Sequence, residues 1–405
     1  METKQPYIIG IGPGNQGYLY PLAEEAIKNA DVLIGGKRNL SEFNHFNKKT
    51  LAIDKSLKDI ATYIEKNWQR EAIAVLASGD TGLFSIRAYL QKQMPKIPFK
   101  VLPGISSLQY LMAQENLSWN EVKIITLHGS DAVNVCNTVA INPATAIFTG
   151  GKNTPRSVAE KLLGLKGLNL EITVGENLSY PEERIVRGKP EEIAELDFDD
   201  LNLMIVKNKA TDKVLWPYCT PGLPDELFIR DEVPMTKSEI RSLIMSKLRL
   251  KADSNILEIG SGTGSCTIEM ALLARDGHVT TIEKNRKAWE LCKKNTEHFG
   301  LDNIELINGS APMDIPSEKS FDRVFIGGSA GNMAEIINTL SGENTRVVVS
   351  AITLESVAEA LKAMDDQGFE NIEVIQAAVS RSKKAGSKHL MLALNPITII
   401  SGDKI

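Results

Sequence analysis

The sequence contains few of the residues that build structural metal sites or disulfide frameworks. Its 405 residues include four cysteines, without a Cys-x-x-Cys pair, and five histidines, without a His-Glu-x-x-His arrangement. Scattered thiols in a long chain are typical of a reducing compartment, and a zinc site needs clustered ligands. We therefore expect a cytoplasmic protein without a metal.

Long apolar runs and an excess of basic residues are also missing. No apolar run reaches the roughly 18–20 residues of a membrane span. The start METKQPYIIG lacks the basic stretch and the apolar core of a secretory signal. The formal net charge is −5, whereas general nucleic-acid and membrane-surface binders are usually basic. The sequence thus predicts a protein that binds neither a membrane nor a nucleic acid.

The sequence does contain short apolar strands that alternate with helical stretches, which predicts an α/β fold with largely parallel sheets. A chain of this length exceeds the size of one core, so at least two domains are expected. In the first half we expect strands at 7–11, 72–77, 122–127, 144–148 and 201–206, and a helix at 106–117 with Ser106 as its N-cap.

A proline-rich stretch at 207–239 interrupts this alternation and marks a domain boundary. We expect a first domain at 1–207, with subdomains at about 1–118 and 119–207, a linker at 208–224 and a second domain at 225–405. The second domain is predicted to have strands at 255–259, 278–283, 303–307, 321–326, 345–350, 371–380 and 388–394, and helices at 265–275, 285–299 and 353–367. Because its last strand follows another strand, we expect an antiparallel hairpin at the end of the sheet.

The stretch ILEIGSGTGS at 256–265 follows a strand and opens a helix. Ser265 stands where the dinucleotide fingerprint G-x-G-x-x-G/A requires its last residue. The pattern is E-x-G-x-G-x-G, with Glu258 as its acid, and it resembles class I S-adenosylmethionine methyltransferases. Glu283 ends the next strand, where a carboxylate can accept both ribose hydroxyls. A plain strand–helix turn with a solvated glutamate, or an NAD reductase, are the alternatives.

The stretch YIIGIGPGNQG at 7–17 also fails the dinucleotide test, because Pro13 removes an amide hydrogen where a phosphate cradle needs donors. Two more loops, ASGDTGLFS at 77–85 and LPGISSLQYL at 102–111, each follow a strand. Since the carboxyl ends of parallel strands meet at one edge of a sheet, the three loops are predicted to wall one cleft. Ordinary turns remain the alternative for each loop taken alone.

The order of these three loops resembles the tetrapyrrole methylase superfamily. LPGISSLQYL, LHGS at 127–130 and VGENLSYPEERI at 174–185 are more closely similar to its C5-methylating members in the corrin pathway. In the second half, GLPDELFIRDEVPMTKSEIR at 222–241, GSAP at 309–312 and IGGSAG at 326–331 resemble the decarboxylating C15-methylating family. The resemblance implies a two-subdomain tetrapyrrole-methylase-like α/β fold followed by a Rossmann-like class I methyltransferase fold.

The resemblance also implies a function in cobalamin biosynthesis. The first half would methylate C5 of a reduced tetrapyrrole, and the second half would methylate C15 and decarboxylate an acetate side chain. It implies two S-adenosyl-L-methionine sites per chain, and both families suggest a homo-oligomer. The implied cofactor contacts are Pro13, Gly79, Asp80, Ser106 and Ser107 in the first half, and Thr236, Gly260, Ser261, Gly262, Thr263, Gly264, Glu283 and Ala311 in the second. Thr81 and Ser310 depart from the patterns, which expect proline and aspartate.

A substrate with many carboxylates needs cations. The segment SRSKKAGSKH at 380–389 has no acidic residue and follows a strand that we expect to be parallel to the others, at the cofactor edge. The candidates for substrate contacts are Arg381, Lys383, Lys384 and Lys388 in this segment, and Arg230, Lys237 and Arg241 before the first strand. A solvated basic turn is the alternative. The catalytic residues are unknown, and only His128 and His389 are weak candidates.

Two other functions remain open at this point. The first is methylation of RNA or tRNA, although IGGSAG at 326–331 is not the Asn-Pro-Pro-Tyr of base-amino methylases, and the acidic balance argues against a large RNA footprint. The second is a non-catalytic S-adenosylmethionine-sensing module, which would bind the cofactor without turnover.

Overall fold

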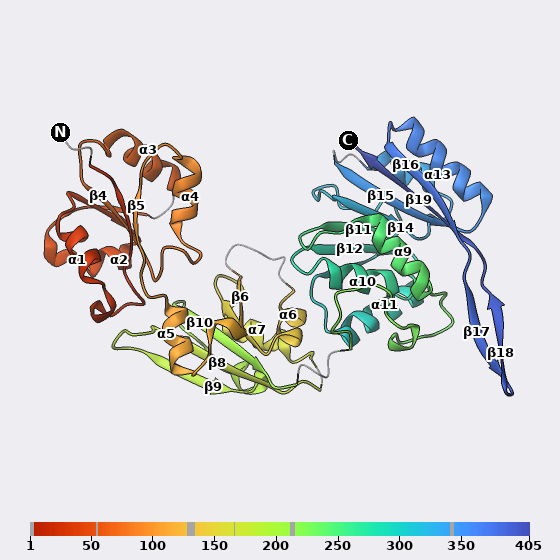
Figure 1. Cartoon of the computed structure of the whole chain (residues 1–405), viewed down its shortest axis with the longest axis horizontal. Coiled ribbons are helices and arrows are strands. Elements are labelled where there is room, and N and C mark those ends of the chain that lie inside the picture. The colour runs from red at the N-terminus through yellow and green to blue at the C-terminus, as the bar shows by residue number, and fades with distance from the viewer. Residues whose placement is uncertain (1–3, 54–55, 128–133, 166, 211–214, 341–343) are drawn as a thin grey trace. The chain divides into compact units, whose positions relative to one another are not determined.

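Two five-stranded sheets and one seven-stranded sheet organise the chain (Figure 1). The computed structural model describes residues 4–53, 56–127, 134–165, 167–210, 215–340 and 344–405. The chain divides into two compact units. Unit 1 comprises Met1–Gly129, Ala144–Glu160 and Leu170–Lys207, and unit 2 comprises Ser130–Pro143, Lys161–Asn169 and Asn208–Ile405.

The first sheet of unit 1 is parallel and has the strand order β3-β2-β4-β1-β5. Its elements are β1 (Tyr7–Gly10), α1 (Pro21–Lys28), β2 (Val32–Gly35), α2 (Lys37–Ser41), β3 (Lys49–Ala52), α3 (Leu57–Asn67), β4 (Ile73–Ala77), α4 (Ile86–Gln93) and β5 (Lys100–Leu102). The strands are short runs of β-branched and aliphatic residues, and successive residues face opposite sides. Ile9 therefore packs with α1 and α2, and Ile8 packs with α3 and α4 (Figure 1).

The second sheet has the order β6-β7-β10-β8-β9 and mixes parallel and antiparallel pairs. Its strands are β6 (Val122–Thr126), β7 (Ala144–Phe148), β8 (Leu170–Glu176), β9 (Arg184–Gly188) and β10 (Asn202–Asn208). The helices in this part of the sequence are α5 (Ser107–Gln114), α6 (Val135–Ile141), α7 (Pro155–Leu162) and α8 (Pro190–Ile193). Helix α5 begins at the N-cap Ser106, as predicted, and buries Leu108 and Leu111 against this sheet.

The seven-stranded sheet of unit 2 has the order β13-β12-β11-β14-β15-β19-β16. Its elements are α9 (Ser238–Leu248), β11 (Asn255–Ile259), α10 (Ser265–Leu273), β12 (His278–Glu283), α11 (Arg286–Phe299), β13 (Ile304–Asn308), β14 (Arg323–Ile326), α12 (Met333–Thr339), β15 (Thr345–Ala351), α13 (Leu354–Asp366), β16 (Glu370–Ala377) and β19 (Ile397–Lys404). Helices α9 and α10 cover one face, and α12 and α13 cover the other. The predicted α/β class is confirmed in both units.

The end of this sheet differs from the prediction. The predicted strand at 388–394 does not join the seven-stranded sheet. Instead β17 (Ser380–Ala385) and β18 (Lys388–Ala393) form a separate antiparallel hairpin, which extends away from the sheet in Figure 1. The sheet is completed by β19, which pairs antiparallel with both β15 and β16. The prediction missed β19, although its central residues are buried between two strands.

A buried ion-pair cluster joins α9 and α10 to the segment before α9. Arg241 is 0% exposed, and its guanidinium lies 2.6 Å from a Glu269 carboxylate oxygen and 2.9 Å from an Asp225 carboxylate oxygen. It also donates to the Thr236 and Leu223 carbonyl oxygens. Its donors are thus used inside the unit, so the expectation that Arg241 contacts a substrate is corrected to a structural role.

Replacing Arg241 with methionine should strongly destabilise unit 2. The change leaves the buried Glu269 carboxylate without its ion-pair partner and removes one ion pair of Asp225, which keeps Arg381. Breaking a buried pair costs about 3–5 kcal/mol. Arg230, which is exposed, provides the matched control, and Arg230→Met should leave the free energy of unfolding almost unchanged. Urea unfolding of both variants tests this. Equal stabilities would show that the buried pair contributes nothing net.

Candidate functional site

In unit 1, three glycine-containing loops meet where the neighbouring strands β1, β4 and β5 end. A Cβ on Gly10 would lie 2.6 Å from the Gly104 nitrogen and 2.7 Å from the Gly79 oxygen. A Cβ on Gly104 would lie 2.3 Å from the same Gly79 oxygen. Gly12 and Gly79 also exchange backbone hydrogen bonds of 3.3 and 2.9 Å. The three strand-end loops therefore come together as predicted, and only glycine allows this backbone approach.

Asp80 ties two of these loops together. One carboxylate oxygen accepts from the Gly104 amide at 3.1 Å, and the other accepts from the Gly82 amide at 2.7 Å. Ser106 caps α5 and forms a capping box with Gln109. Pro13, in the loop that follows β1, is buried. The structure thus brings Pro13, Gly79, Asp80 and Ser106 to one edge of one sheet.

A fourth loop, between β8 and β9, also contacts the first glycine loop. The Asn15 amide donates to the Ser179 hydroxyl at 2.8 Å, and the Ser179 amide donates to the Glu183 carboxylate at 2.6 Å. Burial and a hydrogen bond to Glu183 raise the pKa of Tyr110 to about 12, so its hydroxyl stays a donor. The sequence of this segment indicates a family resemblance but does not predict that it contacts the glycine loop.

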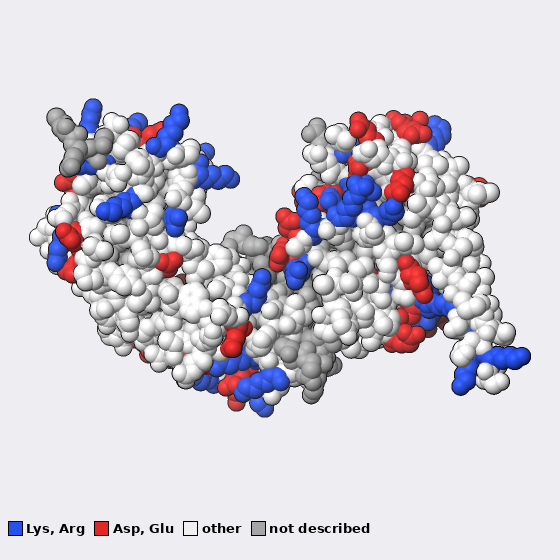
Figure 2. Space-filling view, in the orientation of Figure 1, with Lys and Arg blue, Asp and Glu red and all other residues white. Residues whose placement is uncertain are grey.

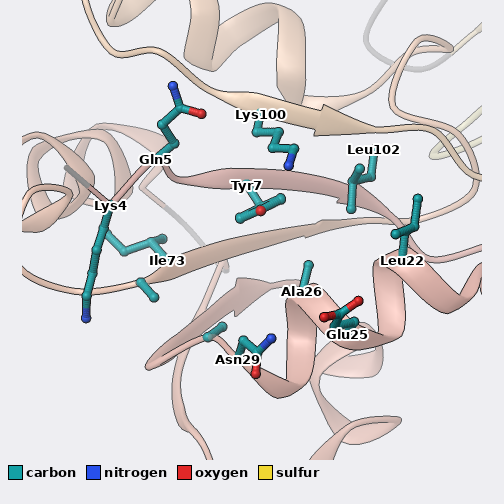
Figure 3. Close-up of a pocket in the computed structure, with 12 residues that line it drawn as sticks. Lys4, Gln5, Tyr7, Leu22, Glu25, Ala26, Asn29, Ile73, Lys100 and Leu102 are labelled. Atoms are coloured by element: carbon teal, nitrogen blue, oxygen red, sulfur yellow. The ribbon is translucent and has the colours of Figure 1, made fainter. Parts of the chain in front are cut away.

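A depression of about 680 Å³ lies at the opposite edge of the same sheet (Figure 3). It is lined by residues at the amino ends of β1, β4 and β5, including Gln5, Ile73 and Lys100, and by one side of α1. The Lys100 ammonium lies over the Tyr7 ring, 5.3 Å from its centroid. Because the glycine loops are at the carboxyl ends of these strands, this depression is not part of the candidate site.

In unit 2, the loop between β11 and α10 has the geometry expected of a cofactor cradle. Gly260, Gly262 and Gly264 have φ angles of 81°, 55° and 81°, which other residues rarely adopt. A Cβ on Gly260 would lie 3.0 Å from the Gly328 nitrogen, and one on Gly264 would lie 2.6 Å from the Cys292 sulfur. The loop is therefore packed between the loop after β14 and helix α11.

Glu283 fixes this loop from the end of β12. One carboxylate oxygen accepts from the Gly262 amide at 2.9 Å, and the other accepts from the Asn285 amide at 2.8 Å. Each oxygen keeps a further lone pair, so the carboxylate can still accept from a ligand hydroxyl. The Pro234 carbonyl, two residues before Thr236, lies 3.4 Å from a Cβ built on Gly262.

Two observations indicate that these residues fit an S-adenosylmethionine-type ligand. Because the residues at the close contacts are glycines, the loop presents backbone atoms rather than side chains at these positions. Within the described part of the chain, the Thr263 hydroxyl is buried and has no hydrogen-bond partner. A buried polar atom without a partner is rare in a native protein and is consistent with a missing ligand.

Two family models match the chain. Residues 7–194 match the tetrapyrrole (corrin/porphyrin) methylases, and residues 226–404 match the precorrin methyltransferase domain. The probable cobalt-precorrin-6B C(15)-methyltransferase (decarboxylating) of Saccharolobus solfataricus is 46% identical over 196 residues, which are 47% of this chain and 98% of the relative. The chain belongs to the precorrin methyltransferases. These are S-adenosylmethionine-dependent enzymes of cobalamin biosynthesis.

Two solved structures are each similar to about half of the chain. The precorrin-6y C5,15-methyltransferase from Geobacter metallireducens is 31% identical, with 46% of this chain and 97% of that chain covered and a TM-score of 0.43. The precorrin-6Y methylase from Archaeoglobus fulgidus is 21% identical, with 51% and 100% covered and a TM-score of 0.42.

Four further candidate residues of this precorrin methyltransferase are Ala311, Ser107, His128 and His389. Ala311 is buried beside Ser310, and its carbonyl accepts from the Asn332 side chain at 3.3 Å. Ser107 is the first residue of α5. His128 lies outside the described residues. His389 lies in β18, opposite Lys384 near the hairpin turn.

The sequence predicted that the basic segment at 380–389 lies at the cofactor edge of the sheet. In the structure it does not lie there, because it forms a separate hairpin. Lys383, Lys384 and Lys388 surround the turn of the β17–β18 hairpin, and Figure 2 shows basic side chains at the hairpin end beyond an uncharged shaft. The reason is that the chain leaves the sheet after β16 and pairs with itself. Arg381, at the base of the hairpin, instead forms ion pairs with Asp225 at 2.9 Å and Glu239 at 2.6 Å.

Glu258, the acid of the glycine motif, is buried completely beneath the loop, where it accepts from the Thr267 hydroxyl. Burial raises the pKa of Glu258 from 4.5 to about 7. A raised pKa means that the folded state holds this proton more tightly than the unfolded state. The contribution of Glu258 to stability is therefore most favourable below about pH 4.5 and falls as the pH rises towards about 7.

The Glu258→Gln variant should lose this pH dependence, because glutamine does not titrate. Its melting temperature relative to that of the wild type should be higher at pH 8 than at pH 5. Thermal unfolding at both pH values measures the difference, and Glu290→Gln on the exposed face of α11 is the control. A gap between variant and wild type that does not change with pH would contradict the assigned protonation state.

Proposed function

We propose that the chain methylates a reduced tetrapyrrole of the precorrin-6Y type at C5 and at C15 and decarboxylates one acetate side chain. Residues 1–207 carry out the C5 methylation, and residues 225–405 carry out the C15 methylation with decarboxylation. The observation that supports two reactions is the pair of separate glycine-loop clusters, one in each unit. The precorrin methyltransferase model, which matches residues 226–404, and the decarboxylating C15-methyltransferase relative support the assignment of residues 225–405.

Each cluster is proposed to bind one S-adenosylmethionine, which supplies an electrophilic methyl group when bound. In the first half we assign Pro13, Gly79, Asp80, Ser106 and Ser107, and in the second half Thr236, Gly260–Gly264, Glu283 and Ala311. The Glu283 carboxylate would accept from the ribose hydroxyls. The close backbone approaches around Gly10, Gly79 and Gly104 would hold the first cofactor against main-chain atoms.

The contribution of the protein to the chemistry is mainly positioning. Methyl transfer to carbon is an in-line displacement, and bringing two bound partners together in the right geometry supplies a large part of the rate enhancement. The meso carbons of a reduced tetrapyrrole are enamine-like and need no strong base, which agrees with the absence of a catalytic cluster among the candidates above. Loss of carbon dioxide leaves an electron pair that the conjugated macrocycle accepts. Arg230, Lys237 and the hairpin lysines remain proposed partners of the substrate carboxylates.

Two single variants of the full chain separate the two methylations. Asp80→Ala removes the acceptor that ties the Gly82 and Gly104 amides together, so the product should lack the C5 methyl group but still lose carbon dioxide. Glu283→Ala removes an ionised acceptor whose hydrogen bonds are worth about 1.5–3 kcal/mol each. Cofactor affinity in the second half should then fall at least about tenfold, and the C15 methyl group should be lost.

Mass spectrometry of the products from a purified reduced tetrapyrrole measures both outcomes, and each variant is the control for the other. Loss of both methyl groups in either variant would show a single shared site. An Asp80→Ala product that lacks the C15 methyl group would reverse the proposed division of labour.

A further inference from the structure

The loop between β4 and α4 contains a backbone conformation that its sequence does not favour. Phe84 has a φ of 47°, in the left-handed region. Glycine and asparagine adopt this region readily, whereas a bulky aromatic residue there is a strained outlier. Such outliers persist where the surrounding structure enforces them, and they concentrate at functional sites.

The neighbours of Phe84 explain why the chain turns at this position. Leu83 packs into the core beneath the second sheet, with Leu108 and Ala146. On the other side, Ser85 caps α4 by accepting from the Arg87 amide at 3.1 Å. Residue 84 must therefore reverse direction between two fixed residues. The turn requires a left-handed residue, but it does not require a phenylalanine.

The side chain of Phe84 is also exposed to solvent, which is unfavourable for an aromatic ring. It is 57% exposed, although burying an aromatic ring is one of the larger gains available to a folded chain. Its ring contacts Phe148 at the end of β7, with centroids 5.3 Å apart and planes at 73°. This partial contact orients the ring without covering it. Backbone strain and an exposed ring thus coincide at one residue, and packing within the unit does not cover the ring.

The position of Phe84 relates it to the first cofactor cluster. The same loop begins with Ser78, Gly79 and Asp80, which meet the other two glycine loops. Phe148 ends β7, and β6 and β7 run parallel, so its end of the second sheet is a carboxyl edge too. Phe84 therefore presents an open aromatic surface between the cofactor loop and the second sheet.

We propose that Phe84 contacts the conjugated ring system of the tetrapyrrole and positions it for methylation in unit 1. A large, flat, apolar macrocycle is the ligand class that an open aromatic ring beside the methyl donor recognises best. This inference rests on the proposed function of residues 1–207 and adds a substrate-contacting residue to it. The ligand would cover the ring and offset the unfavourable features that the free protein retains.

The test combines stability with kinetics in the full chain. Phe84→Gly and Phe84→Asn both accept the left-handed backbone, so the melting temperature should stay the same or rise. The proposed C5 methylation is the one that Asp80→Ala should abolish. The KM for the tetrapyrrole in this methylation should rise about tenfold, which corresponds to about 1.4 kcal/mol of binding. S-adenosylmethionine affinity and the other methylation should not change. Phe84→Tyr, which keeps the ring, should behave like the wild type.

Asn47→Gly is the matched control, because Asn47 also has a left-handed backbone (φ 50°) in unit 1 but lies just before the amino end of β3. It should change neither KM. An unchanged tetrapyrrole KM in Phe84→Gly overturns the proposal. A lowered melting temperature with weaker cofactor binding also overturns it, since Phe84 would then be a packing residue.

Tetrapyrrole binding to the full chain, followed by the absorption spectrum of the ligand, separates this inference from the proposed function. If the wild type adds only one methyl group but Phe84→Gly still binds the tetrapyrrole more weakly, the proposed function fails and the role of Phe84 stands. If the wild type adds both methyl groups and Phe84→Gly binds and reacts normally, the role of Phe84 fails and the proposed function stands.

Discussion

The close approach of backbone to backbone at strand ends is the constraint on which both candidate sites depend. Gly10 and Gly104 lie so close to each other and to the Gly79 carbonyl that neither has room for a Cβ. In unit 2, Gly260 makes the same kind of contact with Gly328. Parallel strands deliver these loops to one edge of each sheet, and the glycines then allow the loops to meet. A ligand at either edge therefore faces main-chain atoms.

Carboxylates hold these glycine loops in place, and each bonds to backbone amides. Asp80 accepts from two amides in unit 1, and Glu283 accepts from two in unit 2. A charged acceptor makes stronger hydrogen bonds than a neutral one. The same residues that the resemblance assigns to cofactor binding thus also shape the glycine loops, and their substitution is expected to change both the loop conformation and cofactor binding.

The sequence predicted those parts of the fold that depend on local pattern. Apolar strands followed by glycine loops, the N-cap Ser106 and the order of strands and helices from β11 to β14 were all visible, because each is encoded within a few residues. Helices α9 and α12 were not predicted. Pairing between strands was not visible in the sequence. Nothing in the sequence around 380–393 shows that the chain pairs with itself and that β19 completes the sheet.

The candidate site also depends on contacts between residues that are distant in sequence, which the sequence did not predict. The positive charge of Arg241 led to the prediction that it contacts a substrate. The sequence does not show its ion pairs, because the buried Asp225 and Glu269 that bind it are distant in sequence. The bond from Asn15 to Ser179 joins segments that no local pattern connects. The left-handed backbone of Phe84 follows from Leu83 and Ser85 being fixed on either side, and a sequence pattern does not reveal such tertiary restraints.

The central claim is that one chain contains two independent S-adenosylmethionine sites. Isothermal titration calorimetry of the full chain measures this most directly. We expect two binding events per chain in the wild type and one in each of Asp80→Ala and Glu283→Ala, with the remaining site unchanged in affinity. A single binding event in the wild type, or the loss of both events in one variant that remains folded, would contradict the account.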